Sequence, residues 1–387
     1  MRQGWEIKTF EEVFDLQMGK TPSRDNLSFW RGENVWVSIA DMNNQKYIST
    51  SKEKITNDAV KNSGIKCVKR GTAIMSFKLS IGKTAIAQTD LYTNEAIMSF
   101  NLRSEYSNIL SEYIYYYLRG YKWQGANKAV MGLTLNKKTI AVNQFCFPSS
   151  KEQQKIVEEL DCLSNMIELK KKQMETYDKL AQSIFYDMFG DPISNNFRWQ
   201  SNNIGTFATC IAGATPSTSI KEYWENGEIP WLSSGEVGKG RITDTEKKIT
   251  KVGYDSCSTR MIPPHTIVIA MAGQGKTRGT VGVAEITLCT NQSICSIVCN
   301  DSVNVDFLYY QLRFLYNELR SISNGDGGRG GLNLKLIQGF KVILPPLLLQ
   351  QEFASKIEAI EKQKELIKQS IAETETLFNS RMDYYFN

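Results

Sequence analysis

The chain has few of the residue patterns that most enzymes and secreted proteins need. It contains one histidine in 387 residues, and its eight cysteines form no C-x-x-C pair. Acid–base catalysis near neutral pH uses histidine more than any other side chain, and His265 directly follows Pro263-Pro264. We therefore interpret His265 as a turn residue. The sequence predicts neither a zinc ribbon nor a disulfide framework.

Long apolar runs are also missing. No stretch reaches the roughly 18 apolar residues that cross a bilayer. The opening Met1-Arg2-Gln3-Gly4-Trp5 does not lead into the apolar core of a secretion signal. We expect a cytoplasmic protein with no membrane association. The net charge of +5 permits a polyanionic partner, but many proteins without affinity for nucleic acid share this small excess.

The cysteines are scattered, and we expect most of them to be small buried hydrophobic residues without a metal. Three of them, Cys289, Cys295 and Cys299, lie close together in the apolar-rich run 288–299, where a strand interior explains them. The remaining five are Cys67, Cys146, Cys162, Cys210 and Cys257.

The chain does contain a long internal repeat. Trp5 recurs as Trp199, 194 residues later, and Gln153-Gln154 recurs as Gln350-Gln351, 197 residues later. Further pairs are Gly19-Lys20-Thr21-Pro22-Ser23 with Gly213-Ala214-Thr215-Pro216-Ser217, Trp30 with Trp224, Trp36-Val37-Ser38 with Trp231-Leu232-Ser233, and Thr93-Asn94-Glu95-Ala96-Ile97 with Thr290-Asn291-Gln292-Ser293-Ile294. This period is too long for a solenoid, so the sequence predicts two tandem copies of one domain-sized module.

Each copy begins with strand and turn signals and ends in a helical part. The runs 72–77 and 266–271 are short, apolar and preceded by turn residues, which indicates buried strands. Residues 112–119 and 306–320 are predicted as related tyrosine-containing helices late in the two modules.

A long amphipathic helix is expected after Pro148 and another from Pro345-Pro346, with Gly190-Asp191-Pro192 ending the first. Apolar residues alternate in steps of four and three, a heptad pattern that is broken in the first helix only by Lys170. The residues expected to pair the helices are Ile156, Leu160, Leu163, Ile167 and Met174 in the first and Phe353, Ile357, Ile360, Ile367 and Ile371 in the second. We expect antiparallel pairing, which turns a tandem repeat into a twofold arrangement with the modules at opposite ends. The alternative is that each helix packs on its own module.

Residues 270–277 resemble a phosphate-binding loop but lack its first glycine and the following helix. They suit a loop that contacts DNA: Gln274 is able to donate and accept at a base edge, and Lys276 and Arg278 to reach guanine or phosphate. A second glycine-rich segment, 324–331, offers flexibility and one cation, Arg329, that could close over a phosphate or simply form a surface turn.

The motifs in this order, repeated and each time followed by a long helix, resemble the specificity subunit of type I restriction-modification systems. The residues that carry the resemblance are Gly213–Ser217, Ile229–Val237, Gly273–Gly279, Thr290–Ile294 and Leu344-Pro345-Pro346 leading to Gln350-Gln351, with weaker versions in the first module. The resemblance implies an α/β fold class with two tandem target-recognition domains, 1–147 and 191–344, separated by two long, antiparallel paired helices, 148–190 and 345–387.

The resemblance further implies a non-catalytic subunit that reads a bipartite site in double-stranded DNA. It implies docking of two methyltransferase subunits, which bring S-adenosylmethionine, and of motor-nuclease subunits, which bring ATP and Mg²⁺; no cofactor is expected in this chain. The first module departs from the pattern at residues 76–81, which contain no Gln-Gly-Lys-Thr-Arg run. The candidate DNA contacts are Thr21, Ser23, Trp36, Ser38, Lys78, Lys83, Thr215, Ser217, Trp231, Ser233, Ser234, Lys239, Arg241, Gln274, Lys276, Arg278 and Arg329.

Two other classes of function stay open at this point. A tandem scaffold that binds proteins through its aromatic-rich modules would explain the weak net charge. A divergent NTPase would rest only on the incomplete phosphate-binding loop.

Overall fold

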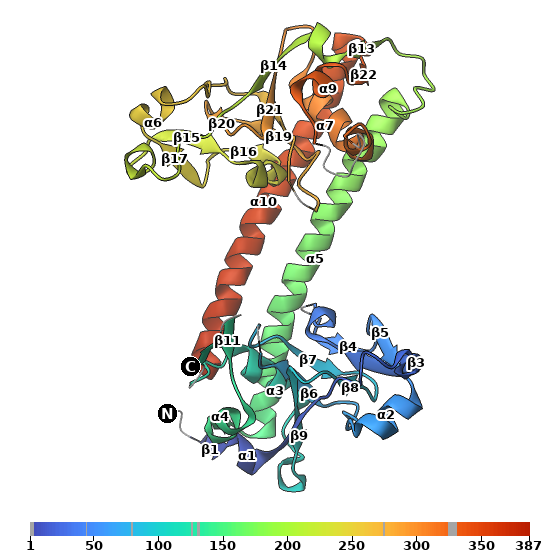
Figure 1. The fold of residues 1–387 in the computed structure, drawn as a ribbon, viewed down its shortest axis with the longest axis vertical. Helices are drawn as coiled ribbons and strands as arrows, with labels where there is room; N and C mark the ends of the chain where they lie inside the picture. The colour runs from blue at the N-terminus through green and yellow to red at the C-terminus, as the bar shows by residue number, and fades with distance from the viewer. Residues whose placement is uncertain are drawn as a thin grey trace. The chain divides into compact units, whose positions relative to one another are not determined.

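The computed structural model describes residues 4–43, 45–78, 80–124, 127–129, 132–273, 275–323 and 331–387. The internal repeat of the sequence is also a repeat of the fold, because the two α/β modules carry equivalent sheets in the same order along the chain (Figure 1). Among the described residues, no helix combines the length and the apolar character that a membrane span requires.

A five-stranded mixed sheet forms the centre of each module. In the first module its order is β2 (Phe14–Met18), β9 (Ile97–Leu102), β6 (Ala73–Ser76), β7 (Thr84–Ala87) and β4 (Tyr47–Ile48). In the second it is β14 (Ala208–Ala212), β21 (Ile294–Cys299), β18 (Thr266–Ala270), β19 (Val281–Ala284) and β16 (Arg241–Ile242). The last strand of each sheet, β4 or β16, is parallel to its neighbour, and the other pairs are antiparallel. The central strands β6 and β18 are buried along their whole length, as their apolar runs predict.

Smaller sheets complete each module. Three strands pair in the order β5 (Glu53–Ile55), β3 (Trp30–Val37) and β8 (Tyr92–Thr93), and equivalently β17 (Lys247–Ile249), β15 (Ile229–Leu232) and β20 (Cys289–Thr290). The two ends of each module pair as β1 (Glu6–Thr9) with β12 (Gln144–Phe147) and β13 (Ser201–Asn203) with β22 (Lys341–Ile343). A further hairpin joins β10 (Asn127–Ala129) and β11 (Gly132–Thr134).

Short helices cover the sheets. The first module has α1 (Phe10–Val13), α2 (Asn57–Ser63), α3 (Ser111–Gly120) and α4 (Lys137–Val142); the second has α6 (Lys251–Asp255), α7 (Val305–Phe314), α8 (Tyr316–Ser321) and α9 (Leu334–Gln338). The single helix predicted for residues 306–320 is therefore wrong, because the chain leaves helical geometry at Leu315 and forms two helices. That break turns α8 toward the loop between β18 and β19, where Tyr316 and Arg320 make contacts.

His265 and Gly71 occupy equivalent positions in the two modules. Both have a left-handed backbone, with φ of 59° and 85°. Each precedes the central strand of its sheet. The prediction that His265 is a turn residue is confirmed.

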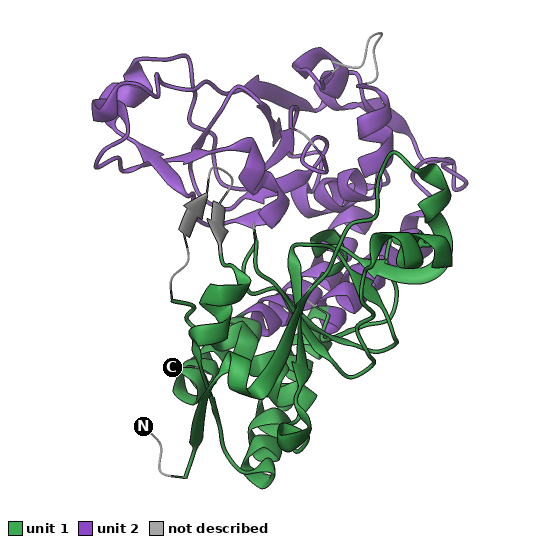
Figure 2. Ribbon diagram, turned by 60° about the horizontal axis from the view of Figure 1, so that its bottom comes forward, with its two compact units in different colours: residues 1–171, 369–387 green, residues 172–368 purple. Residues whose placement is uncertain are grey.

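Two 40-residue helices, α5 (Ser150–Phe189) and α10 (Leu347–Phe386), follow the modules. The chain forms two compact units: Met1–Lys171 with Gln369–Asn387, and Lys172–Lys368 (Figure 2). Each unit contains one module and parts of both long helices. The predicted fold class, two α/β modules with two long paired helices, is confirmed.

Within each unit the two helices run antiparallel. In the first unit Arg381 pairs with Glu159, and Lys171 pairs with Glu375 at 2.8 Å. In the second unit Lys364 pairs with Asp178 at 2.9 Å, and the ring centroids of Phe353 and Phe185 lie 5.5 Å apart. In both units, residues later in α5 meet residues earlier in α10, which is the antiparallel order.

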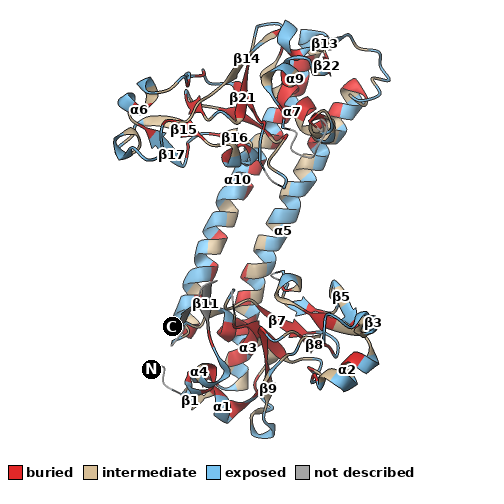
Figure 3. Cartoon of the chain, in the orientation of Figure 1, coloured by how far each residue is buried: buried red, intermediate tan, exposed pale blue. Residues whose placement is uncertain are grey.

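Each core joins a sheet to the ends of both helices. In the first unit, Leu160 of α5 and Phe378 of α10 lie in one cluster with Phe100 of the sheet. In the second unit, Phe185 and Phe353 share a cluster with Ile297. Figure 3 shows the buried residues of each unit gathered where the sheet and the long helices meet. The amphipathic stripes thus pack on the modules as well as on each other.

Candidate nucleic-acid interface

Two of the repeated motifs meet a hairpin loop at one end of the five-stranded sheet in each module, the loop between β6 and β7 or between β18 and β19. In the first module, the backbone amide of Lys20 donates to the carbonyl of Thr93 at 2.8 Å, and the amide of Phe77 donates to the carbonyl of Ala96 at 3.0 Å. In the second, Ala214 donates to Thr290 at 3.0 Å. These bonds place the Gly-x-Thr-Pro-Ser loop and the hairpin loop of the sheet on either side of the Thr-Asn turn. We name this group of three loops the motif cluster of each module: the described residues of 19–23, 77–83 and 93–96, or of 213–217, 271–280 and 290–293.

The tryptophans of the motifs build the motif cluster from inside. Trp36 and Trp231 are only 2% and 5% exposed. Their indole N–H groups donate to the carbonyls of Lys20 and Ala214, and each ring lies edge-on to a second tryptophan. Trp36 and Trp231 were predicted to contact DNA, but they would have to leave the core to reach it, so we assign them to packing.

Several hydroxyl groups predicted to contact DNA are also occupied within the protein. Thr21 donates to Glu95, and Thr215 donates to Gln292. Ser38 and Ser233 cap short 3₁₀ helices, η2 (Ile39–Asp41) and η6 (Ser234–Lys239), through bonds to Asp41 and Glu236. These four side chains fix the shape of loops. Ser23 and Ser217 remain exposed, and Ser234 is half-buried.

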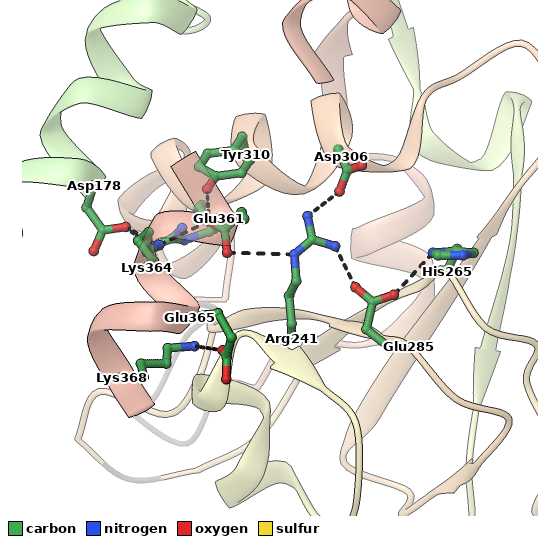
Figure 4. A network of polar contacts seen from close by, with 11 residues as sticks. Asp178, Arg241, His265, Glu285, Asp306, Tyr310, Glu361, Lys364, Glu365 and Lys368 are labelled. Atoms are coloured by element: carbon green, nitrogen blue, oxygen red, sulfur yellow. Dashed lines mark hydrogen bonds and ion pairs between the residues drawn. The ribbon is translucent and has the colours of Figure 1, made fainter. Parts of the chain in front are cut away.

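Two basic candidates of the second module lie in ion pairs. Lys239 pairs with Glu236 at 3.1 Å and Glu246 at 3.0 Å. Arg241 pairs with three carboxylates: Glu285, which directly follows β19, Asp306 of α7 and Glu361 of α10 (Figure 4). A half-buried guanidinium with three carboxylate neighbours is a poor DNA ligand, so we assign Arg241 to internal structure.

The pKa shifts around Arg241 agree with this assignment. Burial alone would lower the pKa of Arg241, but Asp306 and Glu285 outweigh it and raise the pKa. Burial alone would raise the pKa of Glu361, but the hydrogen bond from Tyr310 and the charge of Lys364 lower it. Both groups are therefore held in their charged forms. His265 Nδ1 reaches the same network through Glu285 Oε2 at 3.2 Å.

The hairpin loop of the second module carries two described basic residues, of which Lys276 is exposed and Arg278 is half-buried. Gln274 and Arg329, also predicted to contact DNA, lie outside the described residues. The chain passes from this loop into β19 and not into a helix, which removes the basis of the NTPase hypothesis.

The hairpin loop of the first module carries Lys78 and Lys83, both half-buried. The ammonium of Lys78 lies 5.4 Å from the ring centroid of Phe77. The hydroxyl of Ser76 donates to the carbonyl of Ser80 and accepts from the amide of Lys83 at 3.2 Å, so this loop is closed by its own serine.

The structure also identifies residues that the sequence did not single out. Arg24 lies 3.8 Å above the ring of Trp30 and pairs with Glu53. Its position directly after the Gly-x-Thr-Pro-Ser motif was the available signal. Tyr316 and Arg320, which contact the second hairpin loop, carry no local sequence signal, because their role depends on the break between α7 and α8.

The predicted helix-pairing residues lie on the inner faces of the helices. Buried among them are Ile156, Leu160, Leu163, Phe353, Ile357, Ile360 and Ile367; half-buried are Ile167, Met174 and Ile371. The residues at the ends of the helices pack in the module cores, while those toward the middle are more exposed, because a two-helix contact covers less surface than a core.

In the described part of the chain, no group of histidine, cysteine or acidic residues has the arrangement of a metal site. Cys289 and Cys295 are buried, and Cys162 is exposed. Burial raises the pKa of Cys289 to about 11, as expected for an unreactive core thiol.

Comparison with known proteins gives consistent matches. The family model of the type I restriction modification DNA specificity domain matches residues 2–176 and 196–376. The specificity subunit of the type I restriction enzyme MjaIX of Methanocaldococcus jannaschii is 25% identical over 380 residues, which cover 92% of this chain and 86% of that protein. The EcoR124I/EcoR124II specificity subunit of Escherichia coli is 22% identical over 184 residues, 47% of this chain and 46% of that protein.

Solved structures show the same fold. A chain from a study of complex assembly and conformational transition of the type I restriction-modification system has a TM-score of 0.59 at 17% identity and covers 100% of this chain and 98% of its own. The S subunit of a type I system from M. genitalium has a TM-score of 0.54 at 16% identity and covers 98% and 95%.

Proposed function

This chain belongs to the type I restriction modification DNA specificity domain family, and we propose that it selects the DNA target of such a system by reading a bipartite site, one half with each module. The observation that carries the proposal is the double match of the family model, over two segments that fold into the same α/β module. Two similar modules supply two similar reading surfaces, which suits two half-sites.

The motif clusters are the surfaces we propose for base reading. Glycines at 273, 275 and 279 adopt positive φ, which lets the backbone of the second hairpin loop turn tightly and approach a duplex. Lys276 is exposed beside them, with Ser217 exposed on the Gly-x-Thr-Pro-Ser loop. In the first module the corresponding groups are Ser23, Lys78 and Lys83. Positive and hydroxyl side chains of this kind bond to phosphates and to the acceptors of base edges.

The long helices are the surface we propose for docking two methyltransferase subunits, with motor-nuclease subunits joining the assembly. Large apolar side chains stand exposed on them, which partner subunits commonly cover: Met166, Leu169 and Leu180 on α5 and Leu366 and Leu377 on α10. The partners would bring S-adenosylmethionine, ATP and Mg²⁺, and this chain would contribute specificity without catalysis.

A selection experiment tests the proposal. The full chain, co-expressed with its methyltransferase subunits, is incubated with a pool of random-sequence duplexes, and the bound duplexes are sequenced. We expect two short conserved blocks separated by a fixed number of unspecified bases. Affinity should fall as salt rises, because phosphate contacts release counterions.

The control is a duplex that keeps one block and scrambles the other, which should bind far more weakly than the complete site. Absence of enriched blocks together with salt-independent binding would overturn the proposal and favour the protein-binding scaffold.

A further inference from the structure

The second hairpin loop is held from the side by α8. Arg320 Nη1 donates to the carbonyl oxygens of Gly275 at 3.0 Å and Arg278 at 2.8 Å. The hydroxyl of Tyr316 donates to the carbonyl of Lys276 at 2.8 Å, and Arg320 Nη1 lies 2.9 Å from that hydroxyl oxygen. Three backbone carbonyls of one loop therefore bond to two side chains of one helix.

These contacts fix both sides of the loop at once. The carbonyls of Gly275 and Arg278 stand on either side of the turn, and a single guanidinium nitrogen joins them. Its two hydrogens are shared among three oxygens, and charge-assisted bonds of this kind are roughly twice as strong as neutral ones. The guanidinium carbon also lies 5.3 Å from the ring centroid of Tyr316, which limits the directions that Arg320 is able to take.

The surroundings of Gly279 show that α8 lies in close contact with the loop. Gly279 has φ of 86°, and a Cβ at this residue would lie 3.0 Å from Cγ of Arg320. A glycine here allows both the left-handed backbone and the close approach of the arginine. The amide of Gly279 donates to the carbonyl of Ala270 at 2.8 Å, so the base of the loop is fixed to β18.

The first module closes its loop by another means. There Ser76, at the end of β6, bonds to the backbone of Ser80 and Lys83 within the same loop. The loop of the second module instead depends on a helix that is distant in sequence. Its conformation can therefore be changed without touching the loop itself.

We propose that Arg320, supported by Tyr316, is a positioning residue for DNA recognition: it sets the conformation in which Lys276 and its neighbours meet the second half-site, without contacting a base itself. This inference rests on the proposed function. The side chain of Arg320 bonds backbone groups of the loop, whereas Lys276 gives only its carbonyl to α8 and keeps an exposed side chain. The contacts with α8 thus fix the backbone of the loop and leave the side chain of Lys276 exposed for DNA.

The test compares four single variants, one double variant and one control variant of the full chain, each assembled with its methyltransferase subunits. Binding is measured on a duplex taken from the selection described above and on the same duplex with single-base changes. Arg320→Lys keeps the positive charge but lacks the planar guanidinium whose Nη1 bonds the carbonyls of Gly275 and Arg278. Arg320→Met removes both. Tyr316→Phe removes only the hydroxyl. Lys276→Ala removes the exposed side chain of the loop.

We expect Arg320→Lys and Arg320→Met to reduce discrimination at the second half-site by about tenfold, the range of one well-placed base contact. Discrimination at the first half-site should stay unchanged, because the first module has its own core and closes its own loop. Tyr316→Phe should show the same effect more weakly. In the double variant, Lys276→Ala should have little further effect on Arg320→Met, because groups that act through one another are not additive.

Other outcomes overturn the inference. If Arg320 contacts a phosphate directly, Arg320→Lys retains activity, while Arg320→Met weakens all sequences equally and lowers the salt dependence. Additive losses in the double variant would mean that Arg320 does not act through the loop. Failure of the wild-type chain to select any duplex would count against the proposed function itself, which separates the two results. Arg260→Met, at an exposed arginine of the same module outside the motif cluster, serves as the control for loss of one positive charge.

Discussion

At the scale of single residues, the repeated motifs mostly serve packing and loop shape. Gly213 lies so close to β20 that a Cβ would stand 1.8 Å from the carbonyl oxygen of Thr290, and Gly19 has the same relation to Thr93 in the first module, at 2.2 Å. The tryptophan indoles then bond to the carbonyls of the residues that follow, Lys20 and Ala214. The Gly-x-Thr-Pro-Ser motif and the two tryptophans that follow it are therefore needed together to hold one loop in place.

Gly213→Ala should destabilise the second module by about 2 kcal/mol or more, because overpacking at a fixed backbone contact forces strands apart. The carbonyl of Thr290 is held in place by the amide of Ala214 and the hydroxyl of Thr259, each at 3.0 Å, so it has little room to move. Hydrogen exchange of peptides from the second module, measured by mass spectrometry, should rise, while peptides of residues 4–124 stay protected.

Gly238→Ala is the matched control, since a Cβ there meets no heavy atom within 4 Å. Equal protection in the two variants would show that the approach of Gly213 to β20 does not limit stability.

The sequence predicted these motifs as a set, and the structure shows internal contacts for several members that were predicted to meet DNA. Trp36 and Trp231 stand two residues before Ser38 and Ser233, at the start of a polar loop, where an aromatic ring is as suitable for stacking on a base as for a small core. Only the three-stranded sheets, which bring Ile55 or Ile249 against these rings, decide for the core. The ion pairs of Arg241 were equally impossible to predict from the sequence, because its partners Glu285, Asp306 and Glu361 are far away in sequence.

At the scale of elements, the long helices combine a predictable seam with unpredictable polar contacts. The heptad pattern gave their extent and pairing, because apolar spacing is a local property of the sequence. It treated Lys170 as an interruption. In the structure Lys170 donates to the side chains of Ser370 at 2.7 Å and Thr374 at 2.8 Å. These three residues form a polar layer between α5 and α10 in the first unit. Lys364, only 7% exposed, has the same role in the second unit with Asp178 and Glu361.

Acid should weaken the polar layer of the second unit. The folded pKa values of Glu361 and Asp178 lie below their ordinary values of 4.5 and 3.8, because Tyr310, Lys364 and Arg313 outweigh burial. The stabilisation is thus fully present above these ordinary values and is lost as pH falls through the folded pKa values. Exchange protection of peptides from 353–368 should fall below about pH 4.5, the ordinary value for Glu361.

Glu361→Gln should show part of that loss already at neutral pH, by about 1.5 to 3 kcal/mol, the usual worth of a hydrogen bond to a charged group. Glu358→Gln, in the exposed pair with Lys362 on the same helix, should leave protection unchanged. A wild-type chain whose protection in this segment does not depend on pH would argue against an ionic contribution from this layer.

At the scale of the molecule, each module depends on both long helices. The last turns of α10 belong to the core of the first unit, where Phe386 lies 5.8 Å from Tyr113 and 5.5 Å from Tyr117, measured between ring centroids. Met382 and Phe378 are buried in the same cluster. The sequence boundaries 1–147 and 345–387 separate parts that share one core, because a repeat in sequence shows which segments are alike and not which residues pack together.

This shared core shapes the expected outcome of exchanging modules. Replacing residues 1–145 by the matching part of a relative should change one half of the methylated site and leave the other half unaltered, since the second module keeps its own core. The foreign module would, however, meet Phe378, Met382 and Phe386 with different partners, and mismatched core packing costs about 1–3 kcal/mol. A second chimera that also exchanges residues 369–387 should recover that stability with the same specificity as the first.

Sequencing the methylated positions in cells that express each chimera, together with their thermal unfolding midpoints, gives both readouts. A change in both half-sites would contradict independent modules, and equal midpoints of the two chimeras would contradict the dependence of the first module on the end of α10.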